Sequence, residues 1–234
     1  MTTYCGPPPT PAAWLWQWNL DPVVIAGLVA VAGIGYPLLR DHPDRRRMLA
    51  LALAVLAILF LSPLCGLTSA LFSARSLHHV LLVAVAAPLL AQVVPRTGPT
   101  TPGPAFVVST LVFWAWHVPA LYAAALADTA IYWLMQASLL ATATLFWRAV
   151  FAASPAQGVI TAVVAAAQMG LLGALLALAP APLYAPHLAS TLAWGLGPLA
   201  DQQLAGLLMW VPGMLPYAVV GAMLARRGWR LAAT

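Results

Sequence analysis

The chain has 234 residues, of which 63% are hydrophobic and only 6% are charged. Soluble domains carry about 25% charged residues, so this composition excludes a soluble globular domain and a disordered chain. It is typical of a multi-pass membrane protein whose main solvent is lipid. The ten basic residues are all arginines and the five acidic residues are all aspartates, which gives a formal net charge of +5.

Missing residue types exclude several functions. Without lysine the chain cannot form a retinal Schiff base, and without glutamate it cannot carry an HExxH zinc-protease motif. The chain contains no GxSxG motif and no glycine-rich phosphate loop, so neither serine hydrolysis nor nucleotide hydrolysis is expected. The two cysteines, Cys5 and Cys65, either pair in an oxidising compartment or are incidental, and the sequence favours the second interpretation.

Seven apolar stretches are long enough for membrane-spanning helices, which need about 20 residues. In chain order they are Pro22–Leu39, Met48–Gly66, Leu77–Val94, Ala105–Leu126, Ile131–Phe151, Gly158–Ala179 and Leu199–Ala225. The connections are short, apart from the one before the last stretch, and no second domain or internal repeat is evident. The sequence therefore predicts an all-α, seven-helix membrane bundle over residues 22–225, between an N-terminal tail (1–21) and a short basic C-terminal tail (226–234).

Two segments interrupt this regular pattern. Pro119 lacks an N–H group and leaves the carbonyl of Ala115 without its helical partner. The fourth helix is therefore expected either to kink there or to stop and continue as a short interfacial piece. The uncharged, proline-rich stretch Pro180–Ala200 is expected to pack over the mouth of the bundle, because bare backbone cannot face lipid.

The arginines predict the orientation, because short cytoplasmic loops are enriched in basic residues. In the seven-helix topology only Arg75 falls at one end of the bundle. The other nine share the opposite end: Arg40, Arg45, Arg46, Arg47, Arg96, Arg148, Arg226, Arg227 and Arg230. This distribution predicts an outer N-terminus and a cytoplasmic C-terminus. Basic loops on the anionic inner leaflet of the lipid bilayer explain the positive charge, so no nucleic-acid partner is expected.

Polar residues gather at the predicted outer end. Ionisable groups near membrane depth are costly and are therefore functional candidates. The predicted topology places five ionisable residues at this end, His78, His79, His117, His187 and Asp201, together with the amide of Gln202. The cytoplasmic halves of the helices carry few polar residues, which disfavours an ion pathway through the whole membrane.

The histidines each allow two interpretations. His78 and His79 point about 100° apart on a helix and cannot both face one small site, so the less buried one is equally well placed at the lipid headgroups. Arg75 shares a helical face with His79, where it either contacts a substrate or an anion or has a structural role. His117 is either a metal ligand or proton-active group, or a partner for the carbonyl that Pro119 frees.

The start of the last helix is similarly ambiguous. Asp201 is either a plain helix N-cap or part of a site. Gln202 and Met209 lie on one helical stripe, where Ala205 and Gly206 allow another helix to approach closely. Ordinary packing is the favoured role of Met209, although its thioether also suits Cu(I). Imidazole, carboxylate and thioether at one membrane surface fit a transition metal better than peptide or phosphate chemistry.

Four segments of the chain carry a resemblance to a known family. They are Leu71–Ala74 running into His79–Leu82 and Ala87–Leu90; Trp-His-Val-Pro-Ala-Leu-Tyr at 116–122; Pro-Leu-Tyr at 182–184; and Asp-Gln-Gln-Leu-Ala-Gly-Leu-Leu-Met-Trp-Val-Pro-Gly at 201–213. Together they resemble the CtaG-like family of cytochrome c oxidase (caa3-type) assembly factors. The last segment is the most specific, and the resemblance extends from the second helix to the seventh.

The resemblance implies a non-enzymatic, seven-helix protein of the bacterial plasma (inner) membrane that helps haem–copper oxidases to mature, at their copper centre. The family's motif residues fall on His79, His117, Asp201, Gln202, Met209 and Trp210. One position departs from the pattern. The family often has two histidines four residues apart at the start of the third helix, whereas this chain has Arg75 first and an additional His78. Either His78 or His79 can therefore be the motif histidine.

These observations lead to one functional prediction with two alternatives. Copper, as Cu(I), is expected to bind His79 and His117, with His78 and Met209 as further candidate ligands. Asp201, Gln202 and Trp210 are expected to orient a ligand or a partner. The expected partners are oxidase subunits and a periplasmic copper carrier. The alternatives are a small-ion or metal transporter and a haem-binding redox protein, since histidines from different helices can also ligate haem.

Overall fold

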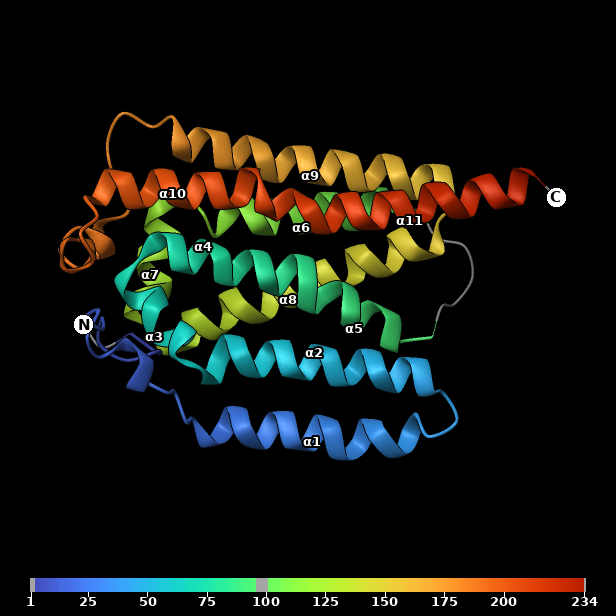
Figure 1. Cartoon of the computed structure of the whole chain (residues 1–234), viewed down its shortest axis with the longest axis horizontal. Helices are drawn as coiled ribbons and strands as arrows, with labels where there is room; N and C mark the ends of the chain where they lie inside the picture. The colour runs from blue at the N-terminus through green and yellow to red at the C-terminus, as the bar shows by residue number, and fades with distance from the viewer. Residues whose placement is uncertain (1–2, 96–100, 234) are drawn as a thin grey trace.

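The computed structural model describes residues 3–95 and 101–233, and this part of the chain contains helices but no strand. The long helices lie side by side and run along one common direction (Figure 1). The N-terminal segment lies at one end of this bundle and the C-terminal helix projects from the other. The all-helical fold that the sequence predicts is confirmed.

The α-helices are α1 (Pro22–Leu38), α2 (Pro43–Leu61), α3 (Pro63–Ala70), α4 (Phe72–Leu81), α5 (Ala87–Val93), α6 (Gly103–Ala115), α7 (Pro119–Ala127), α8 (Thr129–Ala152), α9 (Pro155–Ala177), α10 (Pro198–Trp210) and α11 (Leu215–Ala232). Most of them have proline in the first turn, where the missing N–H has no helical partner to lose. A π-helical segment, η2 (Leu82–Ala86), joins α4 to α5.

Four helical runs are long and apolar enough to cross a membrane: Phe72–Val93, Thr129–Ala152, Pro155–Ala177 and Pro198–Ala232. Two bent pairs, α2 with α3 and α6 with α7, raise the number of candidate spans to six. Helix α1 is apolar but has 17 residues. All seven predicted stretches are thus largely helical, and four to six of them are candidate spans.

The second predicted span is not a single helix, so this prediction is wrong. The chain bends by 50° between α2 and α3. Pro63 has no N–H to continue α2, and the hydroxyl of Ser62 caps α3 by accepting a hydrogen bond from the amide of Leu64 at 3.2 Å. The same hydroxyl donates to the carbonyl of Ile58. Ser62 therefore ends one helix and begins the next.

Near Pro119 the helix stops and a second, short helix begins, as one of the two expected forms requires. Helix α6 stops at Ala115, and α7 begins at Pro119 after a bend of 73°. The carbonyl of Ala115 keeps a partner, because the amide of Val118 donates to it at 3.1 Å. The carbonyl that loses its usual partner is that of Phe113, since the amide of His117 bonds to Trp114 instead.

The third span begins at Phe72, five residues before the predicted start, so Arg75 is helical. Its π-helical segment precedes Pro88, which cannot supply a helical N–H. The indole N–H of Trp147 donates to the carbonyl of Val83 at 2.8 Å. A side chain from α8 thus provides a donor to the irregular backbone between α4 and α5.

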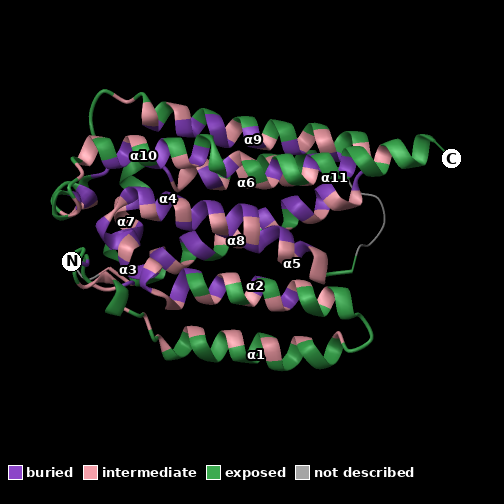
Figure 2. Ribbon diagram, viewed as in Figure 1, coloured by how far each residue is buried: buried purple, intermediate pink, exposed green. Residues whose placement is uncertain are grey.

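The described arginines other than Arg75 lie at one end of the bundle, as the sequence predicts. They belong to the α1–α2 turn, the first turn of α2, the last turns of α8 and the end of α11, which share one end in Figure 1. Arg96 lies outside the described residues. Helix α11 extends to Ala232, so most of the predicted basic tail is helical. Figure 2 shows that α1 is exposed along its length, and none of its residues is buried.

Helices α9 and α10 approach each other through two glycines. A Cβ atom on Gly206 would lie 2.4 Å from the carbonyl oxygen of Gly173, which no real side chain tolerates. The predicted close approach at Gly206 is therefore confirmed, and it fixes the first turns of α10 against the end of α9.

Candidate functional site

The buried polar side chains of the described residues lie at the end of the bundle opposite the arginine-rich turns. They come from α3, α4, the α6–α7 break, α8, α10 and the loop before α10. The charged and imidazole-bearing members are Arg75, His78, His79, His117, His187 and Asp201, each at most 6% exposed. The predicted gathering of polar residues at one end is therefore present in three dimensions.

His79 and His117 face each other across two helical segments. Their ring centroids are 5.8 Å apart and their planes are nearly perpendicular. The Nδ1 atom of His117 lies 2.7 Å from the carbonyl oxygen of Phe113, the carbonyl freed by the helix break. Because a carbonyl only accepts, Nδ1 carries the proton, and Nε2 of the neutral ring keeps a free lone pair. A ligating histidine is oriented by this kind of hydrogen bond.

His78 points in another direction from His79. Its ring packs edge-on against Phe60 of α2, with centroids 5.2 Å apart, while the rings of His78 and His79 are 5.9 Å apart. Both histidines are buried, at 0% and 2% exposure, so the interpretation that places one at the lipid headgroups is wrong. Helix α4 begins earlier than predicted, and the turn that carries both histidines lies buried between neighbouring helices. His79 is the one that contacts His117.

Asp201 caps a neighbouring helix. Its carboxylate accepts hydrogen bonds from the amides of Phe72 at 2.6 Å and Ser73 at 3.2 Å, and from the hydroxyl of Ser73. The N-cap of its own helix is Gly197, so the prediction of a plain N-cap for α10 is wrong. The first turn of α10 lies against the start of α4. The N-cap residue of α4 is Leu71, whose side chain cannot accept a hydrogen bond, so Asp201 accepts from the first amides of α4 instead. It thereby positions the helix that carries His79.

Gln202 holds the start of the loop between α9 and α10. Its side-chain oxygen accepts from the amide of Leu183 at 2.6 Å, and its nitrogen donates to the carbonyls of Leu176 at 3.3 Å and Ala181 at 3.4 Å. The adjacent residues Asp201 and Gln202 thus connect α10 to α4 and to the loop. Both are positioning residues, placed by the same helical turn.

The loop between α9 and α10 packs over the histidines, as predicted. The ring of Tyr184 stacks on Phe72 with centroids 3.7 Å apart, and its hydroxyl donates to the backbone carbonyl of His117 at 2.8 Å. Nε2 of His187 is hydrogen-bonded to the hydroxyl of Tyr122 at 2.6 Å. Burial, with a smaller contribution from Arg75, lowers the pKa of His187 to about 4, so this imidazole is neutral at pH 7. We call residues 178–197 the cover loop.

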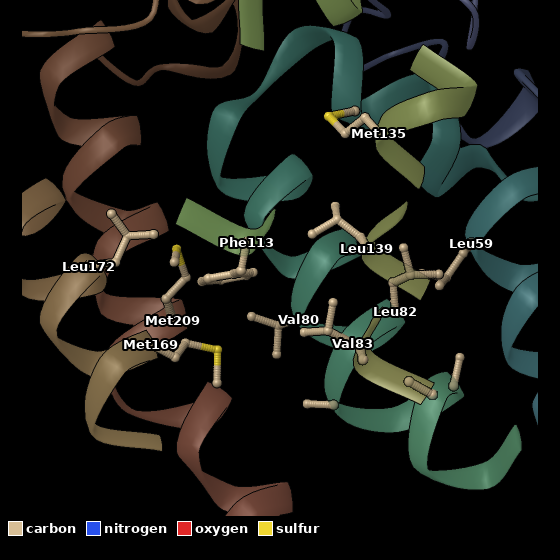
Figure 3. Packing of buried hydrophobic residues seen from close by; sticks show 14 of the residues in the cluster. Leu59, Val80, Leu82, Val83, Phe113, Met135, Leu139, Met169, Leu172 and Met209 are labelled. Carbon is tan, nitrogen blue, oxygen red and sulfur yellow. The ribbon is translucent and has the colours of Figure 1, made fainter. Parts of the chain in front are cut away.

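Met209 and Trp210 differ in their surroundings. Met209 is fully buried in the apolar core, and Figure 3 shows it among Phe113, Met169 and Leu172. This is the packing role that the sequence favours. Trp210 is 40% exposed and its ring lies over Gly170 of α9, outside the buried polar cluster.

Cys5 and Cys65 form a disulfide, with Cα atoms 5.3 Å apart. The interpretation of both cysteines as incidental is therefore wrong. The N-terminal tail folds back onto α3, which brings together two residues that are 60 positions apart in the chain. The hydroxyl of Thr68 donates to the sulfur of Cys5 at 3.7 Å, and this sulfur lies 3.6 Å from the hydroxyl of Tyr132. The cross-link closes the same end of the bundle that holds the histidines.

The sequence did not single out Tyr122, Tyr132 and Gln136, all of which are buried beside the histidines and Arg75. A sequence pattern could have identified Tyr132 and Gln136. Tyr132 and Gln136 are four residues apart in an apolar helix, which places both on one face. Tyr122 ends the segment 116–122 that carries part of the family resemblance, but its contact with His187 joins residues that are 65 positions apart.

The geometry supplies two imidazoles and no larger set of common metal ligands. No group of three or more histidine, cysteine, aspartate or glutamate side chains that could hold a metal occurs in residues 3–95 and 101–233. The Nε2 atom of His79 is buried without a hydrogen-bond partner, and that of His117 carries a free lone pair. This arrangement suits a site of low coordination number.

Comparison with known proteins assigns the chain to a family. The family model of the cytochrome c oxidase caa3 assembly factor (Caa3_CtaG) matches residues 99–230, which is more than half of the chain. The matched range includes His117, Asp201, Gln202 and Met209, whereas His79 precedes it. The chain has no match among curated proteins or solved structures. The described part of the chain is all-helical, with several apolar helices long enough to cross a membrane, and the chain belongs to the cytochrome c oxidase caa3 assembly factor family.

Proposed function

We propose that the chain is a non-enzymatic factor that carries Cu(I) to the copper centre of a haem–copper oxidase from the outer face of the plasma membrane. Membership of the assembly factor family supports the oxidase as the destination. The observation that carries the copper step is the pair of buried imidazoles, His79 and His117, with ring centroids 5.8 Å apart. Imidazole nitrogens bind copper well, and both rings have a nitrogen available for it.

Incomplete coordination suits a protein that passes its metal on. Two imidazoles leave positions open on the ion, so a ligand of the oxidase subunit can replace them one at a time. Met209 is the candidate for a third, soft donor that favours the reduced ion. His78, whose ring faces Phe60, serves as an alternative ligand only if α4 rotates.

The remaining motif residues hold the site in shape. Asp201 fixes the start of α4, and with it the position of His79, by three hydrogen bonds. Gln202 and Tyr184 hold the cover loop over the histidines. Because this loop covers the site, copper enters and leaves when the loop opens toward a copper carrier or an oxidase subunit. Trp210, exposed on α10, is available for contact with such a partner.

The proposed topology has seven spans, with α1 as the first, the N-terminus outside and the C-terminus in the cytoplasm. Two independent features support it. The described arginines other than Arg75 lie at the proposed cytoplasmic end, as basic loops do in membrane proteins. The disulfide lies at the opposite end, and disulfides persist outside the reducing cytoplasm.

Copper content tests the proposal directly. The protein is expressed in a copper-supplemented strain, purified and analysed for copper per chain, and its absorption spectrum is checked for haem. We expect bound copper and no haem in the wild type, and loss of the copper in the His79→Ala/His117→Ala double variant. The matched control is His42→Ala, because His42 is an exposed histidine at the arginine-rich end.

Oxidase activity at limiting copper completes the test. We expect the double variant to reach the membrane in normal amounts, measured by immunoblot, while oxidase activity falls and is partly restored by excess copper. Full activity of the double variant at limiting copper would falsify the proposal. A haem spectrum in the wild type would replace copper transfer with the haem-binding alternative.

A further inference from the structure

Arg75 is a buried cation that forms no ion pair with the described residues. Its side chain is 1% exposed, and none of its three guanidinium nitrogens makes a well-aligned hydrogen bond with the described residues, although the hydroxyls of Tyr122 and Tyr132 lie near it. No carboxylate of the described residues lies within salt-bridge distance of it. The buried carboxylate at this end, that of Asp201, binds Phe72 and Ser73 instead.

This arrangement is unfavourable unless something compensates the charge. A guanidinium stays protonated at every physiological pH, so it cannot become neutral as a buried lysine can. A buried ion without a partner is strongly destabilising, and its remaining N–H groups add the cost of unmade hydrogen bonds. An acceptor that carries negative charge beside Arg75 would remove this cost.

Independent polar groups surround the same place. The guanidinium carbon of Arg75 lies 5.2 Å from the ring centroid of Tyr132 on α8. Gln136, one helical turn after Tyr132, is 2% exposed, and neither its side-chain nitrogen nor its oxygen has a partner. His78, one turn after Arg75, is fully buried, and both of its ring nitrogens are unpartnered. Tyr132 thus lies against Arg75, while Gln136 and His78 each lie one helical turn from one member of this pair.

We propose that Arg75, His78 and Gln136 form a binding site for one small monovalent anion, a halide or a simple carboxylate. The guanidinium contributes the charge and up to two parallel N–H donors, while the imidazole and the amide each add one donor. One negative charge balances Arg75, whereas a divalent anion would leave an unpaired negative charge in the core. Burial on all sides admits a small ion and excludes a large one.

This site is separate from the proposed copper pair. His79 turns toward His117, whereas His78 turns toward Phe60 and shares its side of α4 with Arg75. Anion binding can therefore be measured in copper-free protein, and its outcome is independent of the copper proposal.

Thermal unfolding of purified, copper-free protein in detergent tests the site. The ionic strength is kept constant while gluconate, which is too large, is replaced by chloride, bromide, formate or sulfate. We expect the unfolding midpoint to rise with chloride, bromide and formate and to saturate, because an anion that binds only the folded state stabilises it. Sulfate should produce no saturable rise.

Three variants locate the effect. Arg75→Gln should abolish the anion-dependent shift, and Gln136→Leu should weaken it several-fold in apparent affinity. The matched control, Arg226→Gln, removes an exposed arginine at the other end and should leave the shift unchanged. The absence of any saturable shift in the wild type, or an unchanged shift in Arg75→Gln, would overturn the proposal.

Anomalous scattering from crystals grown in bromide gives a direct answer if Arg75→Gln does not fold. We expect a bromide ion beside the guanidinium of Arg75 in the wild-type protein. Bromide found only at exposed positions, together with an unchanged shift in Gln136→Leu, would contradict the site.

Discussion

The two ends of the bundle differ in how their polar groups are satisfied. At one end the arginines of the α1–α2 turn and of α11 are mostly exposed, and water solvates their charge; the ion pair between Arg40 and Asp41 has side chains that are 80% and 81% exposed. At the other end imidazoles, a carboxylate and a guanidinium are buried. Exposed charges indicate how the chain is oriented in the membrane. Buried polar groups need specific partners and therefore indicate where a functional site lies.

Within the described residues, a covalent cross-link occurs only at the buried end. The disulfide ties the N-terminal tail to α3, and the cover loop is tied to α6 and α7 by Tyr184 and His187. At the exposed end, the guanidinium of Arg148 donates to the carbonyl of Pro95 at 3.1 Å. The histidines therefore lie at the end of the bundle that the disulfide and the cover loop hold together.

The largest effect is expected from removing the disulfide. The Cys5→Ser/Cys65→Ser variant should lose about 4 kcal/mol of unfolding free energy, because the cross-link closes a loop of 60 residues in the unfolded chain. The measurement is the unfolding free energy of the protein in detergent, with and without a reducing agent. The reductant should destabilise the wild type and leave the variant unchanged; equal stability of the two under oxidising conditions would mean that this end is not held by the cross-link.

A somewhat smaller loss is expected when the buried carboxylate is removed. Asp201→Ala leaves two amides of α4 without their acceptor in the core, which should cost roughly 3 kcal/mol. The matched control is Asp128→Ala, since exposed Asp128 also accepts from two amides, those of Ala130 and Ile131. Loss of an exposed cap should cost only about 1 kcal/mol. Equal unfolding midpoints for the two variants would remove the distinction between buried and exposed partners.

The smallest effect on stability is expected at the cover loop. Tyr184→Phe keeps the ring stacked on Phe72 but removes the hydrogen bond to the carbonyl of His117, at a cost of about 1 kcal/mol. Tyr36→Phe is the control, because Tyr36 is an exposed tyrosine at the other end, near Arg46. Hydrogen exchange of the loop amides should accelerate in Tyr184→Phe alone. Unchanged exchange would show that the hydroxyl does not hold the loop closed.

Much of the fold could be predicted from local patterns in the sequence. Apolar stretches of about 20 residues identified seven largely helical regions, and Pro119 marked the break between α6 and α7. The gathering of His79, His117 and Asp201 at one end followed from counting helices, since alternate connections lie on the same side. The glycine at 206 predicted a close helix approach, which Gly173 completes. Each of these features depends on hydropathy or on a residue's own backbone preference.

The partners of the polar residues could not be predicted in this way. Asp201 caps α4 across 129 positions in the chain, and the bond between Tyr122 and His187 spans 65. The disulfide depends on the path of the N-terminal tail. Whether Arg75 has an ion-pair partner depends on which groups the carboxylates of other elements already bind. Sequence alone determined which segments are helical and which polar groups share an end, because these follow from local composition and helix count. Only the tertiary structure decided which group meets which, because that depends on how several helices pack against one another at once.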